Sequence, residues 1–269
     1  MSLVFSAITP HSPVLIPQIG KENLHLLKNT KNAFEELEQN LYVSKAETLI
    51  IISPHGHIQQ NAFTMNLNPE FEINFNEFGD FSTIYKLTGD VGLAYKIRER
   101  LETRAPLQLI SEKMLDHGCG VPLYLLTSYL NNTVAQAVPL KIIPIYYSGL
   151  NLDAHFKFGQ LLKREILFSK NRIAVIASGD LSHRLSKDAP AGFSPVGAKF
   201  DKKIINYLKY KKTQEILKIN NKIINEAGEC GLKSIIILLG ILDEIKFEPD
   251  LLSYESPFGI GYLTMNFKL

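Results

Sequence analysis

Histidines recur in short turns that are marked by glycine or proline and that follow runs of apolar residues. His11 lies between two prolines, His55 and His57 follow the run Thr48–Ile52, and His117 precedes a glycine. A neutral imidazole is the commonest metal ligand in proteins, and it also exchanges protons near neutral pH. One turn histidine can serve structure alone by hydrogen-bonding a carbonyl group, but repetition at separate turns is hard to attribute to packing. The pattern therefore indicates metal binding or acid–base chemistry.

Two further turns add carboxylates to this set. Asp180 and His183 follow the apolar run Arg172–Ala177, and Glu229 lies between glycines ahead of an apolar segment. A buried glutamate is costly unless it is paired or binds a metal, so Glu229 is the natural anionic member of a metal site. Two imidazoles and one carboxylate form the facial triad of non-haem Fe(II) sites. The same ligand types suit a catalytic Zn²⁺ that holds a water, and the spacing does not choose between the two metals.

Buried strands must position these turns. The runs Leu3–Ala7, Thr48–Ile52 and Arg172–Ala177 are short and largely apolar, and Thr48–Ile52 is rich in β-branched residues, which is typical of strands covered on both faces. Between the first two, Lys21–Leu41 has the apolar periodicity of an amphipathic helix. The resulting β-α-β unit predicts parallel strands, whose carboxyl ends share one edge of the sheet, where ligands gather in α/β folds. We therefore expect His11 and His55 at the same edge.

The remaining segments predict one α/β domain over residues 1–269. We expect a mixed, mostly parallel central sheet with helices on both faces, and we expect two surface helices within the lysine-rich residues 199–225. Residues 61–90 are less regular and indicate short strands and loops. The other expected elements are helices at Val91–Leu101, Tyr124–Leu130, Phe156–Phe168 and Ser234–Leu242 and strands at Lys141–Tyr147, Leu251–Tyr254 and Tyr262–Phe267.

Composition limits the classes of partner. The chain has 269 residues, 45% of them apolar, and a formal net charge of +2, which gives no electrostatic reason to expect nucleic acid or an anionic membrane. Its two cysteines cannot form a disulfide framework. The N-terminal residues lack the pattern of a secretory signal, and the longest apolar run, Ile235–Leu242, is far short of the roughly 20 residues that a membrane span needs. We expect a soluble cytoplasmic protein.

These turns, taken together, resemble those of the class III extradiol ring-cleavage dioxygenases. The nearest branch is the LigB-type catalytic subunit, including the AmmeMemoRadiSam system protein B relatives and the Memo proteins. The match keeps the same order along nearly the whole chain. The segments that carry it are Thr9-Pro10-His11-Ser12-Pro13, Ser53-Pro54-His55, Leu115-Asp116-His117-Gly118, Ser178-Gly179-Asp180-Leu181-Ser182-His183, Glu229-Cys230-Gly231 and the C-terminal Leu252–Gly259.

The resemblance implies a role for each residue of the set. His11 and His55 match the two histidine ligands of the family's metal, and Glu229 matches the carboxylate ligand. His183 matches the catalytic acid–base histidine. His117 matches a second active-site histidine that contacts substrate or bound oxygen.

The same turns also contain Asp180, His57, Cys119 and Cys230, whose expected roles are less direct. Asp180 stands where it could orient a neighbouring imidazole, a usual duty of residues behind metal ligands. His57 is extra relative to the Ser-Pro-His-x-Pro form of this branch; it is either a spare ligand or a surface histidine, and we favour the surface interpretation. Memo-like relatives carry a cysteine in the metal site, whereas this chain has both Glu229 and Cys230. We expect Cys230 and Cys119 to be small buried residues rather than ligands.

The implied function is an Fe(II)-dependent extradiol dioxygenase that cleaves a catecholic ring with O₂. Fe(II) is the expected metal and Zn(II) the alternative. The competing functions are a Memo-like accessory binding protein without ring cleavage and a zinc-dependent hydrolase, because a fold does not imply a function. The expected partners are a catechol-like substrate and O₂, with a homodimer and a small accessory subunit left open. We expect the substrate pocket to be walled by residues 61–90 and 190–195.

Overall fold

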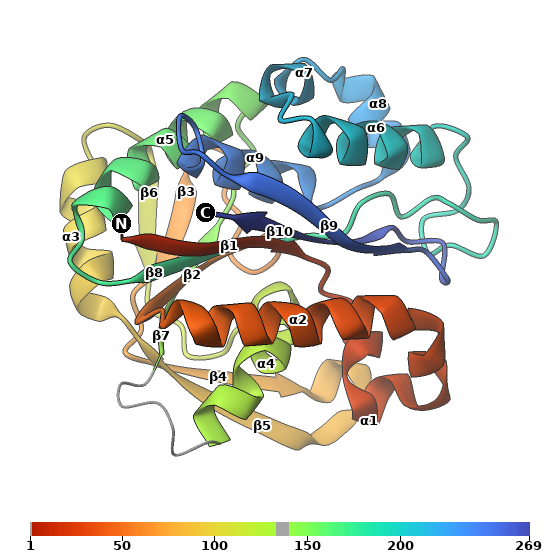
Figure 1. The fold of residues 1–269 in the computed structure, drawn as a ribbon, viewed down its shortest axis with the longest axis horizontal. Helices are drawn as coiled ribbons and strands as arrows, with labels where there is room; N and C mark the ends of the chain where they lie inside the picture. The colour runs from red at the N-terminus through yellow and green to blue at the C-terminus, as the bar shows by residue number, and fades with distance from the viewer. Residues whose placement is uncertain (1, 133–139) are drawn as a thin grey trace.

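The computed structural model describes residues 2–132 and 140–269, which build a layered α/β structure around one sheet (Figure 1). Ten strands are described in it, and the hydrogen-bonded order is β4-β5-β7-β2-β8-β1-β10-β9, with β3 pairing with β6 and β7. The strands are β1 (Leu3–Thr9), β2 (Thr48–Ser53), β3 (Phe63–Asn66), β4 (Glu70–Phe75), β5 (Asp80–Gly89), β6 (Leu107–Ile110), β7 (Lys141–Tyr146), β8 (Ile173–Ser178), β9 (Glu248–Glu255) and β10 (Tyr262–Lys268).

The centre of the sheet is parallel and completely buried. Strand β8 pairs in parallel with both β1 and β2, and β2 pairs in parallel with β7. Helices cover both faces of these strands, and their almost purely aliphatic sequences suit this burial. Strands β10 and β9 continue the sheet antiparallel beyond β1, and the β4–β5 hairpin lies at the other side. The predicted mixed, mostly parallel sheet is therefore confirmed, although β8 separates β1 from β2.

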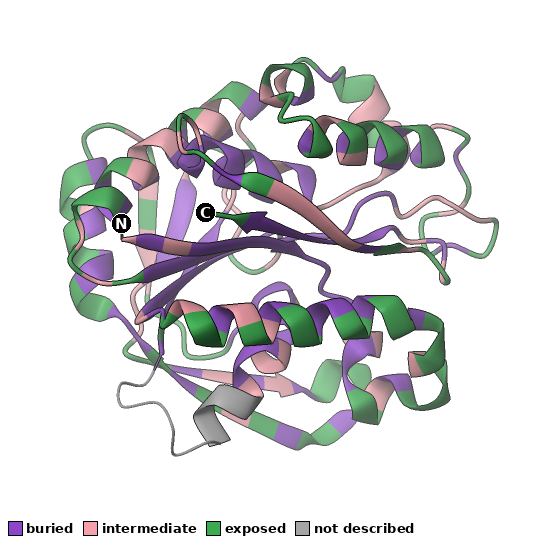
Figure 2. Cartoon of the chain, viewed as in Figure 1, coloured by how far each residue is buried: buried purple, intermediate pink, exposed green. Residues whose placement is uncertain are grey.

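Alternate residues of β2 enter two different cores. Leu49 and Ile51 pack in the cluster beneath helices α2 and α4, whereas Ile50 and Ile52 pack in the cluster beneath α5 and α9. In Figure 2 the central strands are drawn largely in purple, the colour of buried residues. The α-helices are α1 (Pro17–Gly20), α2 (Lys28–Ser44), α3 (Val91–Leu101), α4 (His117–Asn132), α5 (Leu152–Phe168), α6 (Gly197–Lys209), α7 (Thr213–Leu217), α8 (Asn221–Ala227) and α9 (Leu232–Ile241), and the short 3-10 helices are η1 (Pro13–Leu15), η2 (Lys21–Leu27) and η3 (Asn76–Phe78).

The starts of two helices differ most from the prediction, each by seven residues. Lys21–Leu27 is a 3-10 helix, and the α-helix that follows begins at Lys28. Helix α4 begins at His117 rather than at Tyr124, because the Asp116 carboxylate accepts the amide of Cys119 at 3.1 Å and so caps the first turn. Within the described ranges, no helix has the length and apolarity that crossing a bilayer requires.

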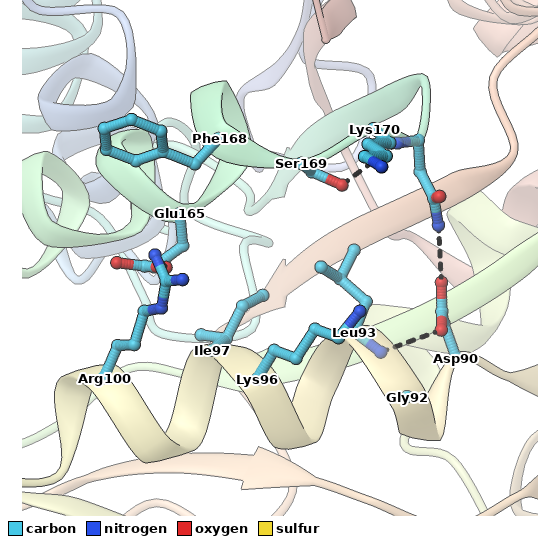
Figure 3. A pocket seen from close by; sticks show the side chains of 11 residues that line it. Asp90, Gly92, Leu93, Lys96, Ile97, Arg100, Glu165, Phe168, Ser169 and Lys170 are labelled. Carbon is cyan, nitrogen blue, oxygen red and sulfur yellow. Dashed lines mark hydrogen bonds and ion pairs between the residues drawn. The ribbon is translucent and has the colours of Figure 1, made fainter.

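A cavity of about 500 Å³ lies between α3 and α5, beside the amino-terminal end of the central strands (Figure 3). Asp90 is fixed there by two contacts: Oδ1 accepts the amide of Leu93 at 3.0 Å, and Oδ2 accepts the hydroxyl of Thr48 at 2.6 Å. Lys96 and Arg100 stand on its α3 wall. None of the candidate site residues lines this cavity, because all of them follow the opposite ends of the strands.

Candidate metal centre

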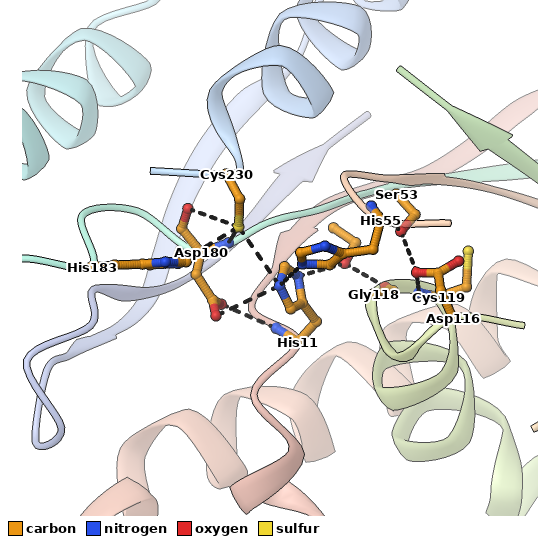
Figure 4. A network of polar contacts seen from close by, with 10 residues as sticks. His11, Ser53, His55, Asp116, Gly118, Cys119, Asp180, His183 and Cys230 are labelled. Atoms are coloured by element: carbon orange, nitrogen blue, oxygen red, sulfur yellow. Dashed lines mark hydrogen bonds and ion pairs between the residues drawn. The ribbon is translucent and has the colours of Figure 1, made fainter. Parts of the chain in front are cut away.

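Three histidines converge beyond the carboxyl ends of the parallel strands. One potential ligand atom from each of His11, His55 and His117 lies within 4.8 Å of the others. His11 stands two residues after β1, His55 two residues after β2, and His117 opens α4. The Nε2 atoms of His11 and His55 are 3.1 Å apart (Figure 4). The expectation that His11 and His55 meet at one edge of the sheet agrees with this arrangement.

His11 is held with one ring nitrogen directed at the centre. Its Nδ1 lies 3.1 Å from Ser178 Oγ, and that hydroxyl donates at 2.5 Å to the carbonyl oxygen of Gly118. Because the hydroxyl hydrogen is used there, the Nδ1–H of His11 is the donor to Ser178. The Nε2 lone pair therefore faces His55. Asp180 adds a second restraint, since its Oδ1 accepts the backbone amide of His11 at 3.1 Å. Such partners fix the orientation of metal-binding imidazoles.

The end of β2 is tied to the start of α4. Asp116 Oδ1 accepts the hydroxyl of Ser53 at 2.6 Å, and the Ser53 hydroxyl oxygen accepts the amide of His55 at 3.2 Å. Gly118 permits this approach, because a Cβ there would lie 2.4 Å from Ser53 Oγ. The rings of His55 and His117 consequently stack with centroids 4.3 Å apart.

The local electrostatics keep the imidazoles of His11 and His55 neutral. Burial lowers the pKa of His11 well below its usual value, and the nearby His117 and His183 lower it further. Burial also lowers the pKa of His55 to about 3, with His11 contributing next. Neutral imidazoles are the form that binds a metal. A spacing of 3.1 Å is close to the roughly 3.0–3.4 Å that separates two nitrogens bound side by side to one ion at the usual distances. The group therefore fits a divalent metal.

Cys230, rather than Glu229, faces the histidines. Its Sγ is 3.6 Å from His11 Nε2 and 3.7 Å from His183 Nε2. Glu229 lies outside the three-histidine group: its Oε2 accepts the amide of Leu232 at 2.6 Å, in the first turn of α9. The structure therefore does not bring Glu229, the predicted carboxylate ligand, to His11 and His55. The side chains of Glu229 and Cys230 are neighbours in the chain but point in different directions. The thiol that we expected to be merely a small buried residue takes the place beside His11.

Backbone contact sets the position of Cys230. The carbonyl oxygen of Asp180 accepts the amides of Cys230 at 3.3 Å and Gly231 at 2.9 Å, so the turn after β8 holds the turn before α9. Gly179 and Gly231 lie against each other, since a Cβ on Gly179 would be 2.1 Å from the Gly231 Cα. Two glycines from turns more than fifty residues apart therefore allow the thiol to reach the site.

The predicted acid–base histidine stands on the far side of the thiol. His183 is half-buried, and burial lowers its pKa while Asp180 partly offsets that effect. Burial raises the pKa of Asp180 to about 6, and the nearest charge that opposes this rise is His183. Asp180 Oδ2 also lies 3.7 Å from His11 Nε2. The arrangement places one carboxyl between two imidazoles.

A cavity of about 510 Å³ opens beside the histidines. His55 and His117 form one side of it, and Asn74, Glu77 and Phe78 form another. We expected residues 61–90 to wall the substrate pocket, and Asn74, Glu77 and Phe78 do line this cavity. Residues 190–195, which we also expected in the wall, do not line it.

His57 stands in the wall of the same cavity and outside the metal group. It is half exposed, and its Nε2 is 2.7 Å from Glu112 Oε1. Its position agrees with the surface interpretation rather than with that of a spare ligand.

Sequence reasoning missed Ser178 and Asp116 as supporting residues, although both stand inside the turns that it singled out. A polar residue at the last position of a buried strand, as Ser178 is, could have drawn attention to it.

Comparison with known proteins decides the family. The family model described as "Catalytic LigB subunit of aromatic ring-opening dioxygenase" matches residues 6–265. The chain belongs to the LigB family. Protein CA_C1420 of Clostridium acetobutylicum is 33% identical over 278 residues, and the alignment covers all of this chain and 58% of that protein. The chain thus spans little more than half the length of this curated relative.

A solved structure supports the LigB-type fold. The uncharacterized protein JW3007 from Escherichia coli K12 superposes with a TM-score of 0.69 at 16% sequence identity, covering 98% of this chain and 99% of that one. At such low identity the likeness concerns the fold alone. The chain therefore combines membership of the LigB family with a three-histidine group that could hold a metal ion.

Proposed function

We propose that the chain is an Fe(II)-dependent extradiol dioxygenase that opens a catecholic ring with O₂. The observation that carries this proposal is the convergence of His11, His55 and His117 beside a cavity of about 510 Å³ in a LigB family chain. Fe(II) held by this group would supply Lewis acidity toward a diol and a binding position for dioxygen. The volume is within the range of small-molecule pockets.

Individual residues of the chain have distinct roles in this proposal. His183 accepts a proton from the diol, since its lowered pKa leaves the ring neutral near pH 7. Asp180 faces that ring and favours its protonated form, so it supports the transfer. Phe78 packs edge-on against His117 with centroids 5.2 Å apart and offers the cavity an aromatic wall for the ring of a substrate. His117 belongs both to the three-histidine group and to the lining of this cavity, so the cavity opens directly onto the metal position.

The test is anaerobic loading with Fe(II), followed by a panel of catechols and admission of air. We expect a yellow ring-opened product from the wild type, and we expect a His183→Gln variant to retain iron while losing turnover by about 10²-fold or more. A matched His155→Gln variant controls for loss of a buried imidazole elsewhere, since His155 binds the turn after β7 through Ser148 and lies outside the metal group. Iron retention without product from any catechol would contradict ring cleavage.

The position of Cys230 favours one second candidate, a Memo-like metal-binding protein that does not cleave rings. A thiol near neutral imidazoles forms a softer donor set than a facial triad, and such sets also suit zinc. Metal analysis of protein purified without added metal would separate the two candidates. Bound iron supports the dioxygenase, whereas stoichiometric zinc with no turnover after exchange to iron supports the second candidate.

A further inference from the structure

The cavity beside the histidines is lined by acidic groups without matching cations. Glu77, Glu112 and Asp116 contribute carboxyl groups, and no lysine or arginine of the described residues lines it. His57 pairs with Glu112 at 2.7 Å, which leaves Glu77 without an ion pair in the described part of the chain. Asp116 Oδ2 is buried with no hydrogen-bond partner. The cavity wall therefore presents the carboxyl group of Glu77 without a paired cation, and that of Glu112 with only the imidazole of His57 beside it.

The acidic wall is held in place by the backbone around it. Asn66 accepts the amide of Glu112 at 3.1 Å and donates to its carbonyl oxygen at 2.9 Å. The next residues are bound to β4, because Leu115 donates to the Glu72 carbonyl at 3.0 Å. Glu112 is thus presented from a fixed segment rather than from a free loop.

Apolar and aromatic side chains also line the cavity, and one of them contacts a histidine of the metal group. Phe78 contacts His117, and Met114, Leu115 and Tyr146 complete this part of the lining. Tyr146 is buried, and burial raises the pKa of its hydroxyl, so it remains uncharged. An aromatic ring placed here would have the metal position at one end and the carboxylates of Glu77 and Glu112 along the wall.

We propose that this cavity selects catechol-like substrates whose side chain ends in a cationic amine, and that Glu77 and Glu112 determine this preference. The inference rests on the proposed function, because it assumes that the diol end of the ligand occupies the metal position. A carboxylate at the same place would face two like charges, which is a common device for rejecting wrong ligands. An ammonium group at that place would be attracted by the carboxylates of both glutamates.

The test compares three probes that differ mainly in the charge of a short side chain: dopamine, 4-ethylcatechol and 3-(3,4-dihydroxyphenyl)propionate. Binding to Fe(II)-loaded protein is measured by calorimetry without oxygen, so that no turnover is needed. Partly exposed charge pairs are worth up to about 1 kcal/mol each, so we expect dopamine to bind at least about fivefold more tightly than the propionate, with the neutral probe between them. Added salt should reduce this ratio.

Variants assign the preference to the two glutamates. The double variant Glu77→Gln with Glu112→Gln should bring the three affinities together, and Glu77→Lys should shift the preference toward the propionate. The double variant Glu35→Gln with Glu36→Gln, an equal charge change on the exposed face of α2, should leave the wild-type order unchanged. Equal affinities in the wild type, or a preference that survives in the double variant, would overturn the inference and leave the proposed function standing. Failure of all three probes to bind would overturn the proposed function and, with it, this inference.

Discussion

Two neighbouring residues, Glu229 and Cys230, offer the metal centre different donors, and only one of them points at it. The Cys230 thiol contacts His11 and His183, while the Glu229 carboxylate binds the first turn of α9. Burial raises the pKa of Glu229 to about 7, and the amide of Leu232 is the largest influence that lowers it. The Oε2 atom of Glu229 is thus engaged at the start of α9, and its side chain lies outside the three-histidine group.

Metal affinity should distinguish the two residues. We expect Cys230→Ser to weaken metal binding by more than about tenfold, since even residues behind the ligands cost that much when removed. Glu229→Gln keeps an oxygen for the Leu232 amide and should leave the affinity unchanged. Competition with a chromogenic chelator measures both. The reverse order, with Glu229→Gln losing the metal and Cys230→Ser retaining it, would restore the carboxylate as the ligand.

The turns after β8 and before α9 act as a single structural unit at the metal centre. They meet at Gly179 and Gly231, where any side chain would enter the opposing backbone. This contact positions Cys230, Asp180 and His183 at the site together. Its geometry therefore affects the metal centre as well as local packing.

Substitution at this contact tests that dependence. Gly179→Ala should lower the free energy of unfolding by about 1–3 kcal/mol, as overpacking does, and should also weaken metal binding. Gly92→Ala in the first turn of α3 is the matched control, because the nearest atom to its added Cβ is Asp90 Oδ1 at 3.9 Å. The control should be neutral or stabilising by about 1 kcal/mol at most. Urea unfolding and chelator competition measure the two effects, and a neutral Gly179→Ala would show that the turns can separate without cost.

Helix α6 ties the same region to strand β9 through a buried carboxyl. Asp201 accepts the amide of Ser182 at 2.9 Å and the hydroxyl of Tyr254 at 2.6 Å, and it is only 1% exposed. Burial raises its pKa from 3.8 to about 6, and the Tyr254 hydrogen bond is the largest influence that lowers it. The folded protein therefore retains a proton over a range of pH in which the unfolded chain has already lost it.

This difference fixes the sign of a pH effect on stability. Between pH 3.8 and about 6 the unfolded state binds fewer protons than the folded state, so Asp201 makes the free energy of unfolding fall as pH rises. The fall is about 3 kcal/mol at most. Asp201→Asn cannot ionise, so its stability relative to the wild type should improve from pH 4 to pH 6.5. Urea unfolding across this range measures it, and parallel profiles for the two proteins would contradict the prediction.

The sheet explains which parts of the site could be predicted from sequence. His11, His55 and Asp180 each stand two residues after a buried parallel strand, and an aliphatic run followed by a polar turn indicates such a position. The order of strands was not predictable in this way, because β8 enters between β1 and β2 only through long-range pairing.

The choice between Glu229 and Cys230 was also beyond the sequence. It depends on how one turn rotates when Gly231 meets Gly179, a contact between segments far apart in the chain. His117 entered the metal group for a similar reason: capping by Asp116 starts α4 earlier than its periodicity indicates.

Metal binding should couple to the stability of the complete fold, because the candidate ligands His11, His55 and His117 come from separate segments of the chain. An ion that binds only the folded chain at a hundred times its Kd adds about 2.7 kcal/mol. For a protein of this size that corresponds to a rise in Tm of about 5–10 °C. We expect this rise for the wild type with Fe(II) under anaerobic conditions, measured by calorimetry or circular dichroism. His11→Ala should remove it, whereas His25→Ala, an exposed histidine outside the metal group, should keep it. An undiminished rise in His11→Ala would place the metal elsewhere.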